Sequence, residues 1–224
     1  VYKRQLTRLS IELLSPISVL TAIAFTPSFS ISFAVLTGGL STRFGQNKLV
    51  FKIDEKSILD IVLELVPPRF PLYIIGEKHT DKKITAFNDI EPGLGPLGGI
   101  YTALKKIRSK YLFILGGDMP FINPQLLNEM VKLVPYKNAD IIAPLNNGFY
   151  EPLFAIYSRR VLKTAEEQIN RKSYKITDLY KNLRVFIVEE EFWKKYDREG
   201  MSFVNINTTE DLTKFNELFK KCSD

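Results

Sequence analysis

Residues 31–48 read ISFAVLTGGLSTRFGQNK, a short apolar run followed at once by a loop rich in glycine. The apolar part, residues 31–36, predicts a buried β-strand. Glycines have no Cβ, so the backbone N–H groups of such a loop can approach a polyphosphate closely and present positive potential to it. Arg43 and Lys48 add cationic donors. The stretch therefore predicts a phosphate-binding loop after a buried strand. It is not a Walker A loop, because Lys48 lies three residues past Gly45.

Downstream of this loop, short apolar stretches alternate with segments of helical pattern. We expect strands at residues 72–75, 84–90, 111–115, 140–143, 153–157, 185–188 and 203–204, and helices at 57–66, 98–107 and 124–134 and from residues 158, 173 and 208. This alternation favours an α/β protein with a mostly parallel central sheet in three layers. No linker or internal repeat divides the chain, so we expect one domain.

A second candidate site residue, Asp118, follows the strand predicted at residues 111–115, within Gly116-Gly117-Asp118-Met119-Pro120. We therefore expect it at the carboxyl edge of the sheet, where α/β proteins place their ligands. A single carboxylate beside a phosphate loop suits a Mg²⁺ ion that takes its other ligands from phosphates and water. The alternative is that Asp118 caps the helix that begins at Pro124.

Two amides, Asn205 and Asn207, end the last predicted strand. Side chains at positions i and i+2 of a strand point to the same side, so one of them could serve a ligand. Capping of the helix from Thr208 explains the same segment equally well.

The pattern G-x-G-x-x-G occurs at residues 93–98, and Asp118 lies twenty residues beyond its last glycine. Taken alone, this pattern indicates a dinucleotide-binding fold. However, Glu91-Pro92 separates the pattern from the strand before it. The match therefore gives only weak support for nicotinamide or flavin binding.

Composition excludes several classes of protein. With 45% hydrophobic and 25% charged residues, the chain is neither disordered nor collagen-like. One cysteine excludes an internal disulfide and suits a reducing compartment. One histidine, His79, excludes a multi-histidine metal site and reads as a surface residue. The net charge of +6 comes from basic residues that often lie near acids. This distribution favours an ordinary surface, or phosphate binding at one site, over nucleic-acid binding.

Residues 1–30 are expected to be a spurious or disordered N-terminal extension. No methionine precedes Met119, and the apolar run at residues 17–25 is too short to cross a bilayer. Pro16 and Pro27 also weaken the rival prediction of a signal peptide.

Taken together, the motifs resemble the molybdenum cofactor guanylyltransferase family (MobA), in order and spacing from residue 31 to about residue 219. The matching motifs are Leu36-x-Gly38-Gly39-x-Ser41-x-Arg43-x-Gly45-x-x-Lys48, Pro92-Gly93-x-Gly95-Pro96-Leu97-Gly98-Gly99-Ile100, Gly117-Asp118-Met119-Pro120 and Asn205-x-Asn207-Thr208. The resemblance implies a three-layer Rossmann-like nucleotidyltransferase fold, with residues 31–224 as a single nucleotidyltransferase domain. It also implies transfer of GMP from Mg-GTP to the terminal phosphate of molybdopterin, which gives a guanine dinucleotide and pyrophosphate.

By the same resemblance, each motif residue takes a role. Arg43, Lys48 and Asp118 would be catalytic, and Asp118 would hold Mg²⁺. The nucleotide would contact Leu36, Thr37, Gly38, Gly39, Lys48, Asp89 and Asp118. Asn205 and Asn207 would lie near the acceptor phosphate, where related sugar nucleotidyltransferases carry an Asp. Thr37 replaces the family's usual alanine, which is a small change in a tight loop.

The Leu-x-Gly-Gly start resembles guanylyl enzymes, whereas cytidylyl relatives usually carry Leu-Ala-Ala-Gly. Open alternatives are a CTP-dependent molybdopterin enzyme, an enzyme with a sugar-phosphate or cobinamide-phosphate acceptor, and a non-catalytic GTP-binding protein. The implied partners are GTP and molybdopterin, without nucleic acid or membrane. We expect a cytoplasmic monomer or weak homo-oligomer that makes transient contact with other cofactor-biosynthesis proteins.

Overall fold

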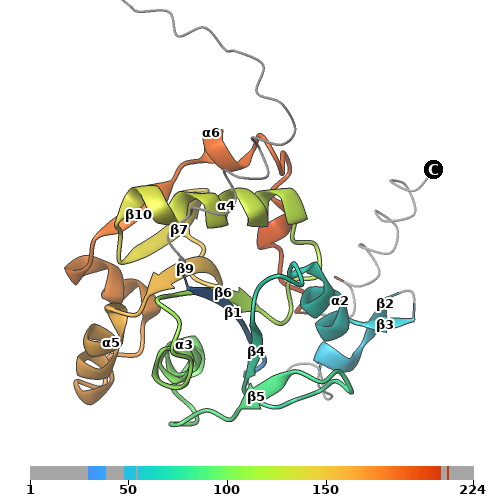
Figure 1. Ribbon diagram of the computed structural model, residues 1–224, viewed down its shortest axis with the longest axis horizontal. Coiled ribbons are helices and arrows are strands. Elements are labelled where there is room, and N and C mark those ends of the chain that lie inside the picture. Colours follow the sequence, from blue (N-terminus) through green and yellow to red (C-terminus); the bar gives the residue numbers. More distant parts are fainter. Residues whose placement is uncertain (1–29, 39–47, 54, 208–210, 212–224) are drawn as a thin grey trace, which may run out of the picture.

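A mixed sheet of eight strands forms the middle of the protein, with helices on both faces (Figure 1). The computed structural model describes residues 30–38, 48–53, 55–207 and 211. The main path of the sheet runs in the order β10-β7-β9-β6-β1-β4-β5, and β8 pairs with β7. The strands are β1 (Ile31–Leu36), β4 (Leu72–Ile75), β5 (Thr85–Phe87), β6 (Tyr111–Gly116), β7 (Ile141–Asn146), β8 (Phe149–Tyr150), β9 (Phe154–Ser158) and β10 (Val185–Val188).

Strand direction decides which loops share an edge of the sheet. β1 pairs in parallel with β4 and β6, and β4 pairs in parallel with β5. β9 runs antiparallel to both β6 and β7. The residues that leave β1, β5, β6 and β7 and the residues that enter β9 therefore meet at one edge. The predicted α/β class with a mostly parallel sheet is confirmed.

Each face of the sheet is covered by its own set of helices. These are α2 (Ile58–Leu65) and α4 (Pro124–Lys137) on one face, and α3 (Gly95–Lys106) and α5 (Val161–Asn170) on the other (Figure 1). Between β1 and α2 lie the short helix η2 (Lys48–Val50) and a hairpin of β2 (Lys52–Ile53) and β3 (Lys56–Ser57). Ser57 caps α2 by accepting from the N–H of Asp60 at 3.0 Å.

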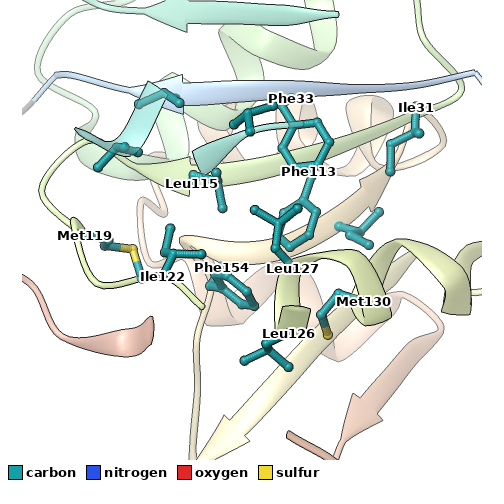
Figure 2. Close-up of a cluster of buried hydrophobic side chains, with 14 of the residues drawn as sticks. Ile31, Phe33, Phe113, Leu115, Met119, Ile122, Leu126, Leu127, Met130 and Phe154 are labelled. Carbon is teal, nitrogen blue, oxygen red and sulfur yellow. The ribbon is translucent and has the colours of Figure 1, made fainter. Parts of the chain in front are cut away.

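Aromatic rings organise the core on the α2 and α4 face (Figure 2). Phe33 of β1 stacks on Phe113 of β6 with ring centroids 5.1 Å apart, and Phe113 meets Phe154 of β9 edge to face at the same distance. All three rings are fully buried. Because neighbouring strands contribute one ring each, this packing stabilises the order of the three central strands, which positions the site at their ends.

On the α3 face, close packing depends on a missing side chain. A Cβ on Gly99 would stand 3.0 Å from Cδ1 of Leu36, so the glycine lets α3 approach the end of β1. The helix begins at Gly95, three residues before the predicted start, and Gly93 and Gly95 adopt the positive φ angles that favour glycine. The G-x-G-x-x-G pattern thus serves the turn into α3.

Two predictions after residue 170 were wrong. The helix expected from residue 173 is the 3₁₀ helix η3 (Ile176–Asn182), and the strand expected at residues 203–204 is replaced by the 3₁₀ helix η4 (Met201–Phe203). In η4 the Asp197 carboxylate accepts the backbone N–H groups of Met201 and Ser202, so a side chain rather than a neighbouring strand satisfies them. The helix expected from residue 208 lies outside the described residues, except for residue 211.

Four short elements were not predicted: η2, the β2–β3 hairpin, β8 and the helix α6 (Glu190–Trp193). Each has only a few residues, too few for a hydrophobic period to emerge. Within the described part of the chain, no helix is both long and apolar enough to cross a bilayer.

Candidate active site

The candidate site starts where β1 ends. The backbone N–H of Thr37 donates to the carbonyl of Ile75 at 2.8 Å, and its side-chain oxygen lies 3.1 Å from the same carbonyl and 2.7 Å from that of Glu77. On the other side, Gly117 N–H donates to the carbonyl of Leu36 at 2.9 Å. These bonds fix the first residues of the glycine-rich loop between the ends of β4 and β6. The threonine that replaces the family's usual alanine is thus a buried, hydrogen-bonded anchor.

Asp89, which follows β5, lies against Gly38. A Cβ on Gly38 would stand only 2.9 Å from Oδ2 of Asp89, so the carboxylate occupies space that any other residue at position 38 would fill. Its second oxygen, Oδ1, is buried and accepts no hydrogen bond from the described residues. Burial raises the pKa of Asp89 above its ordinary value. The structure therefore brings two predicted nucleotide-binding residues together and holds a desolvated carboxylate there.

Asp118 follows β6 through two glycines that are needed for space. A Cβ on Gly116 would stand 2.8 Å from Oδ1 of Asp118, and one on Gly117 would stand 2.9 Å from the carbonyl oxygen of Leu36. The Asp118 side chain thus folds back over its own strand end, beside the loop that begins at Thr37. This is the carboxyl-edge position predicted from the sequence.

Asn205 and Asn207 are joined to Asp118 by the residue between them. The N–H of Ile206 donates to the carbonyl of Asp118 at 2.9 Å, and the Ile206 side chain is fully buried with Ile53 and Ile58. Both asparagines are exposed. The buried isoleucine therefore holds the two amides at the same edge as the carboxylate.

The segment before these asparagines is fastened to the body of the protein. Ser202 Oγ accepts from Asn123 N–H at 2.9 Å, and Asn123 caps α4 by accepting from the N–H groups of Gln125 and Leu126. The Trp193 indole donates to the carbonyl of Leu145 at 3.0 Å. Although residues 193–207 contain little regular structure, the side chains of Ser202 and Trp193 fasten the segment to backbone groups of Asn123 and Leu145.

Mg²⁺ fits the donor set of this edge. No cluster of three or more His, Cys, Asp or Glu side chains occurs among the described residues, so an ion held by protein side chains alone is not supported there. Mg²⁺, however, retains waters and is usually bound through one or two carboxylates together with substrate phosphates. Asp118 supplies such a carboxylate at the strand end beside the glycine-rich loop.

Part of the predicted site cannot be placed. Gly39 and Arg43 lie outside the described residues, and for Lys48 only the backbone, at the start of η2, is described. His79 is not a freely solvated residue: its side chain is 20% exposed, and Nε2 lies 3.2 Å from the carboxylate of Glu77.

One polar residue at this edge was missed. Glu151 lies just before β9, and its backbone N–H donates to the carbonyl of Pro144 at the end of β7. Oε1 accepts from Nδ2 of Asn146 at 2.9 Å, and burial raises the pKa of the carboxyl. The sequence alone gave no signal for it, because its place at the edge depends on the antiparallel direction of β9.

The start of the glycine-rich loop, the desolvated carboxylate of Asp89 and the carboxylate of Asp118 thus lie at one edge of an α/β sheet. This is the edge at which doubly wound α/β proteins bind their ligands. The sequence model of the MobA-like NTP transferase domain matches residues 33–186. The chain belongs to this family, and it is a nucleotidyltransferase.

Individual relatives agree with this assignment. The chain is 36% identical over 191 residues to the "probable molybdenum cofactor guanylyltransferase" of Natranaerobius thermophilus, covering 82% of this chain and 93% of the relative. It is 30% identical to the Bacillus subtilis protein with the same name, covering 80% and 91%. Among solved structures, molybdopterin-guanine dinucleotide biosynthesis protein A from Archaeoglobus fulgidus superposes with a TM-score of 0.75 at 28% identity, covering 85% of this chain and 99% of that one.

Proposed function

We propose that this protein transfers GMP from Mg-GTP to the terminal phosphate of molybdopterin, forming a guanine dinucleotide cofactor and releasing pyrophosphate. The observation that carries the proposal is the 2.9 Å bond from Ile206 N–H to the Asp118 carbonyl. It joins the two predicted acceptor-binding amides to the predicted metal carboxylate, beside the nucleotide loop. The relatives named as guanylyltransferases, which align over most of the chain, support the choice of substrates.

Within this proposal, the start of the loop receives the nucleotide. The nucleotide contacts Leu36, Thr37 and Gly38 at the end of β1, with Asp89 as a polar partner. Arg43 and Lys48 neutralise phosphate charge. Leu36, Thr37 and Gly38 are fixed before binding by the hydrogen bonds of Thr37, so little ordering of this part of the chain accompanies nucleotide binding.

Asp118 would hold Mg²⁺, which when bound supplies positive charge to the phosphates of the nucleotide. Asn205 and Asn207 orient the acceptor phosphate toward the α-phosphate of GTP. A phosphate acceptor is already ionised at neutral pH, so the chain need not provide a general base. Catalysis then consists of positioning and charge neutralisation as pyrophosphate leaves.

The test is a pyrophosphate-release assay of the full chain with Mg²⁺ and each of GTP, CTP, ATP and UTP, with and without molybdopterin. Release only with GTP plus molybdopterin is the expected result. Release with CTP would show that the enzyme uses the cytidine nucleotide. Release with a sugar phosphate or cobinamide phosphate in place of molybdopterin would show that this compound is the acceptor. Tight GTP binding without release under any condition would make the protein a binder rather than an enzyme.

The proposal also covers the location, the oligomeric state and the protein contacts of the enzyme. We expect a cytoplasmic monomer or weak homo-oligomer that takes molybdopterin from other cofactor-biosynthesis proteins through transient contacts. Light scattering over a range of concentrations tests the oligomeric state.

A further inference from the structure

The carboxyl edge of the sheet carries chemistry that the proposed roles leave unused. Along the edge, Asp89 follows β5, Gly38 follows β1, Asp118 follows β6 and Glu151 precedes β9. In the sheet order, β5 and β9 are four strand spacings apart, which is about 19 Å at the usual spacing. One partly buried carboxylate thus lies at each end of a row whose middle strand is β1, and Asp118, after β6, lies one strand from the Glu151 end and three strands from the Asp89 end.

Glu151 is held in place by its backbone. Its N–H donates to the carbonyl of Pro144 at 3.0 Å, and its carbonyl accepts from Phe154 N–H at 3.1 Å. Next to it, the Tyr150 ring packs edge to face on Tyr180 with centroids 4.6 Å apart. Both neighbouring strands therefore restrict where the carboxylate can lie.

Only part of the Glu151 carboxylate is used within the protein. Oε1 accepts from Asn146 Nδ2, and Oε2 has no hydrogen-bond partner among the described residues. Oε2 is not completely buried, because Asp89 Oδ1 is the single fully buried side-chain N or O atom without a partner in the described part of the chain. Burial raises the pKa of Glu151 despite the bond from Asn146, so the ionised form lacks full compensation in the free protein.

The position of Glu151 indicates which part of the reaction it faces. Gly116 N–H donates to the Leu153 carbonyl at 3.0 Å, so β9 begins directly beside the end of β6. Asp118 lies two residues beyond Gly116, and Glu151 lies two residues before Leu153, away from the nucleotide side of the row at β1, β4 and β5. A molecule that presents its phosphate near Asp118 and extends over β9 would bring its far end to Glu151.

We propose that the Glu151 carboxylate, steadied by Asn146, binds the 2-amino-4-oxopyrimidine edge of the acceptor's pterin ring. This proposal rests on the proposed function, since it takes molybdopterin as the acceptor. A pterin presents its N3–H and 2-amino N–H donors side by side, and a carboxylate presents two acceptors to match them. Glu151 is thus a specificity-determining residue that acts at a distance from the reacting phosphates.

Guanine carries the same pair of donors, so the test must distinguish binding of the pterin by Glu151 from binding of the guanine. Full-length wild type and Glu151→Gln are compared for binding of two fluorescent probes, 6-hydroxymethylpterin and 6-hydroxymethyl-lumazine. Lumazine has a carbonyl oxygen in place of the 2-amino group, so it suits a carboxamide, which offers one donor and one acceptor. GTP and ITP, which differ by the same amino group, are compared in parallel.

Wild type is expected to prefer the pterin over the lumazine by about tenfold to a hundredfold, as for loss of a hydrogen bond to a charged group. Glu151→Gln should abolish or reverse this preference, while its ratio of GTP to ITP affinity stays that of wild type. Equal binding of the two probes by wild type, binding of neither, or an unchanged preference in the variant overturns the proposal. A change confined to the GTP to ITP ratio also overturns it, and assigns Glu151 to the guanine instead.

The matched control is Glu190→Gln. Glu190 Oε1 accepts from the N–H of Asn147 at 2.8 Å, in the turn of the β7–β8 hairpin, and the residue lies outside the proposed contact. If Glu151 only stabilised the hairpin, both variants would lower the binding affinity for the two probes to the same extent, and the proposal would fail. Pyrophosphate release by wild type, measured separately with GTP and molybdopterin, reports on the proposed function and leaves the probe ratio as an independent result.

Discussion

Replacing Asp89 by Asn should make the protein more stable and its nucleotide binding weaker. In the free protein, Oδ1 of Asp89 is buried and accepts no hydrogen bond from the described residues, and Oδ2 lies against Gly38. The carboxylate is therefore ionised in a place that does not compensate its charge, and burial raises its pKa. Asparagine keeps the shape and removes the charge.

The size of the effect follows from the cost of an uncompensated polar group. A buried acceptor without a partner costs about 1–3 kcal/mol, and more when it is charged. Asparagine keeps a neutral polar atom there, so the substitution recovers only the excess cost of the charge, and the partial exposure of Asp89 keeps this excess small. We expect Asp89→Asn to raise the free energy of unfolding by about 1–2 kcal/mol at pH 7. For a chain of this size, that corresponds to a rise in Tm of roughly 2–8 °C.

The stability difference should depend on pH in a defined direction. Because the pKa of Asp89 is higher in the folded than in the unfolded protein, ionisation destabilises the folded state. The penalty is complete above the folded pKa and absent below the unfolded pKa, which is about 3.9. The advantage of Asp89→Asn should therefore be largest at neutral pH and shrink as the pH falls toward 4.

Urea unfolding of both proteins between about pH 4 and 8, with GTP affinity measured by calorimetry, checks this expectation. Asp81→Asn, at an exposed carboxylate, is the control for loss of one negative charge. GTP binding should weaken by at least about tenfold, which corresponds to one lost hydrogen bond to the nucleotide. A variant that is less stable than wild type at pH 7, or an advantage that does not change with pH, would refute the reasoning.

Three further substitutions test the middle and the acceptor side of the site. Asp118→Asn should keep the Tm and lower kcat about a hundredfold or more in the pyrophosphate assay, whereas undiminished turnover would contradict its metal role. Gly117→Ala places a Cβ 2.9 Å from the backbone oxygen of Leu36, so it should lower the free energy of unfolding by about 1–3 kcal/mol in urea titration; wild-type stability would show that the strand ends can move apart. Asp197→Ala removes the acceptor of two backbone N–H groups before Asn205 and should raise KM for molybdopterin more than KM for GTP, while an equal rise in both would argue against its selective role.

The parts of the fold with strong local signals were predicted well. β1 and β6 are runs of apolar residues buried along their whole length, and glycines follow each of them, so strand and loop could both be identified. Asp118 could then be assigned to the carboxyl edge. Asp89 was identified by family resemblance alone, because its defining contact is with Gly38, 51 positions earlier in the chain.

The remainder depends on contacts that a segment makes with residues outside it. The segment at residues 201–203 looks like a strand because Phe203 is apolar, yet the Asp197 carboxylate turns it into a 3₁₀ helix. Glu151 could not be assigned to the edge until the antiparallel pairing of β9 with β6 was known. Secondary-structure propensity depends on the residues within one segment. The 3₁₀ helix at residues 201–203 and the position of Glu151 depend instead on contacts with residues outside their segments.

The reversed strand β9 also bears on how such an enzyme can change its acceptor over evolutionary time. The half of the edge proposed to bind the nucleotide is made by residues leaving parallel strands, and after β1 and β5 the chain crosses back over the sheet through the helices α2 and α3. The other half is entered through the β7–β8 hairpin, whose Asn147-Gly148 tip is exposed. Exposed hairpin tips of small and polar residues tolerate insertion. An insertion at this tip can therefore change which acceptor fits, while the residues proposed to bind the triphosphate stay unchanged.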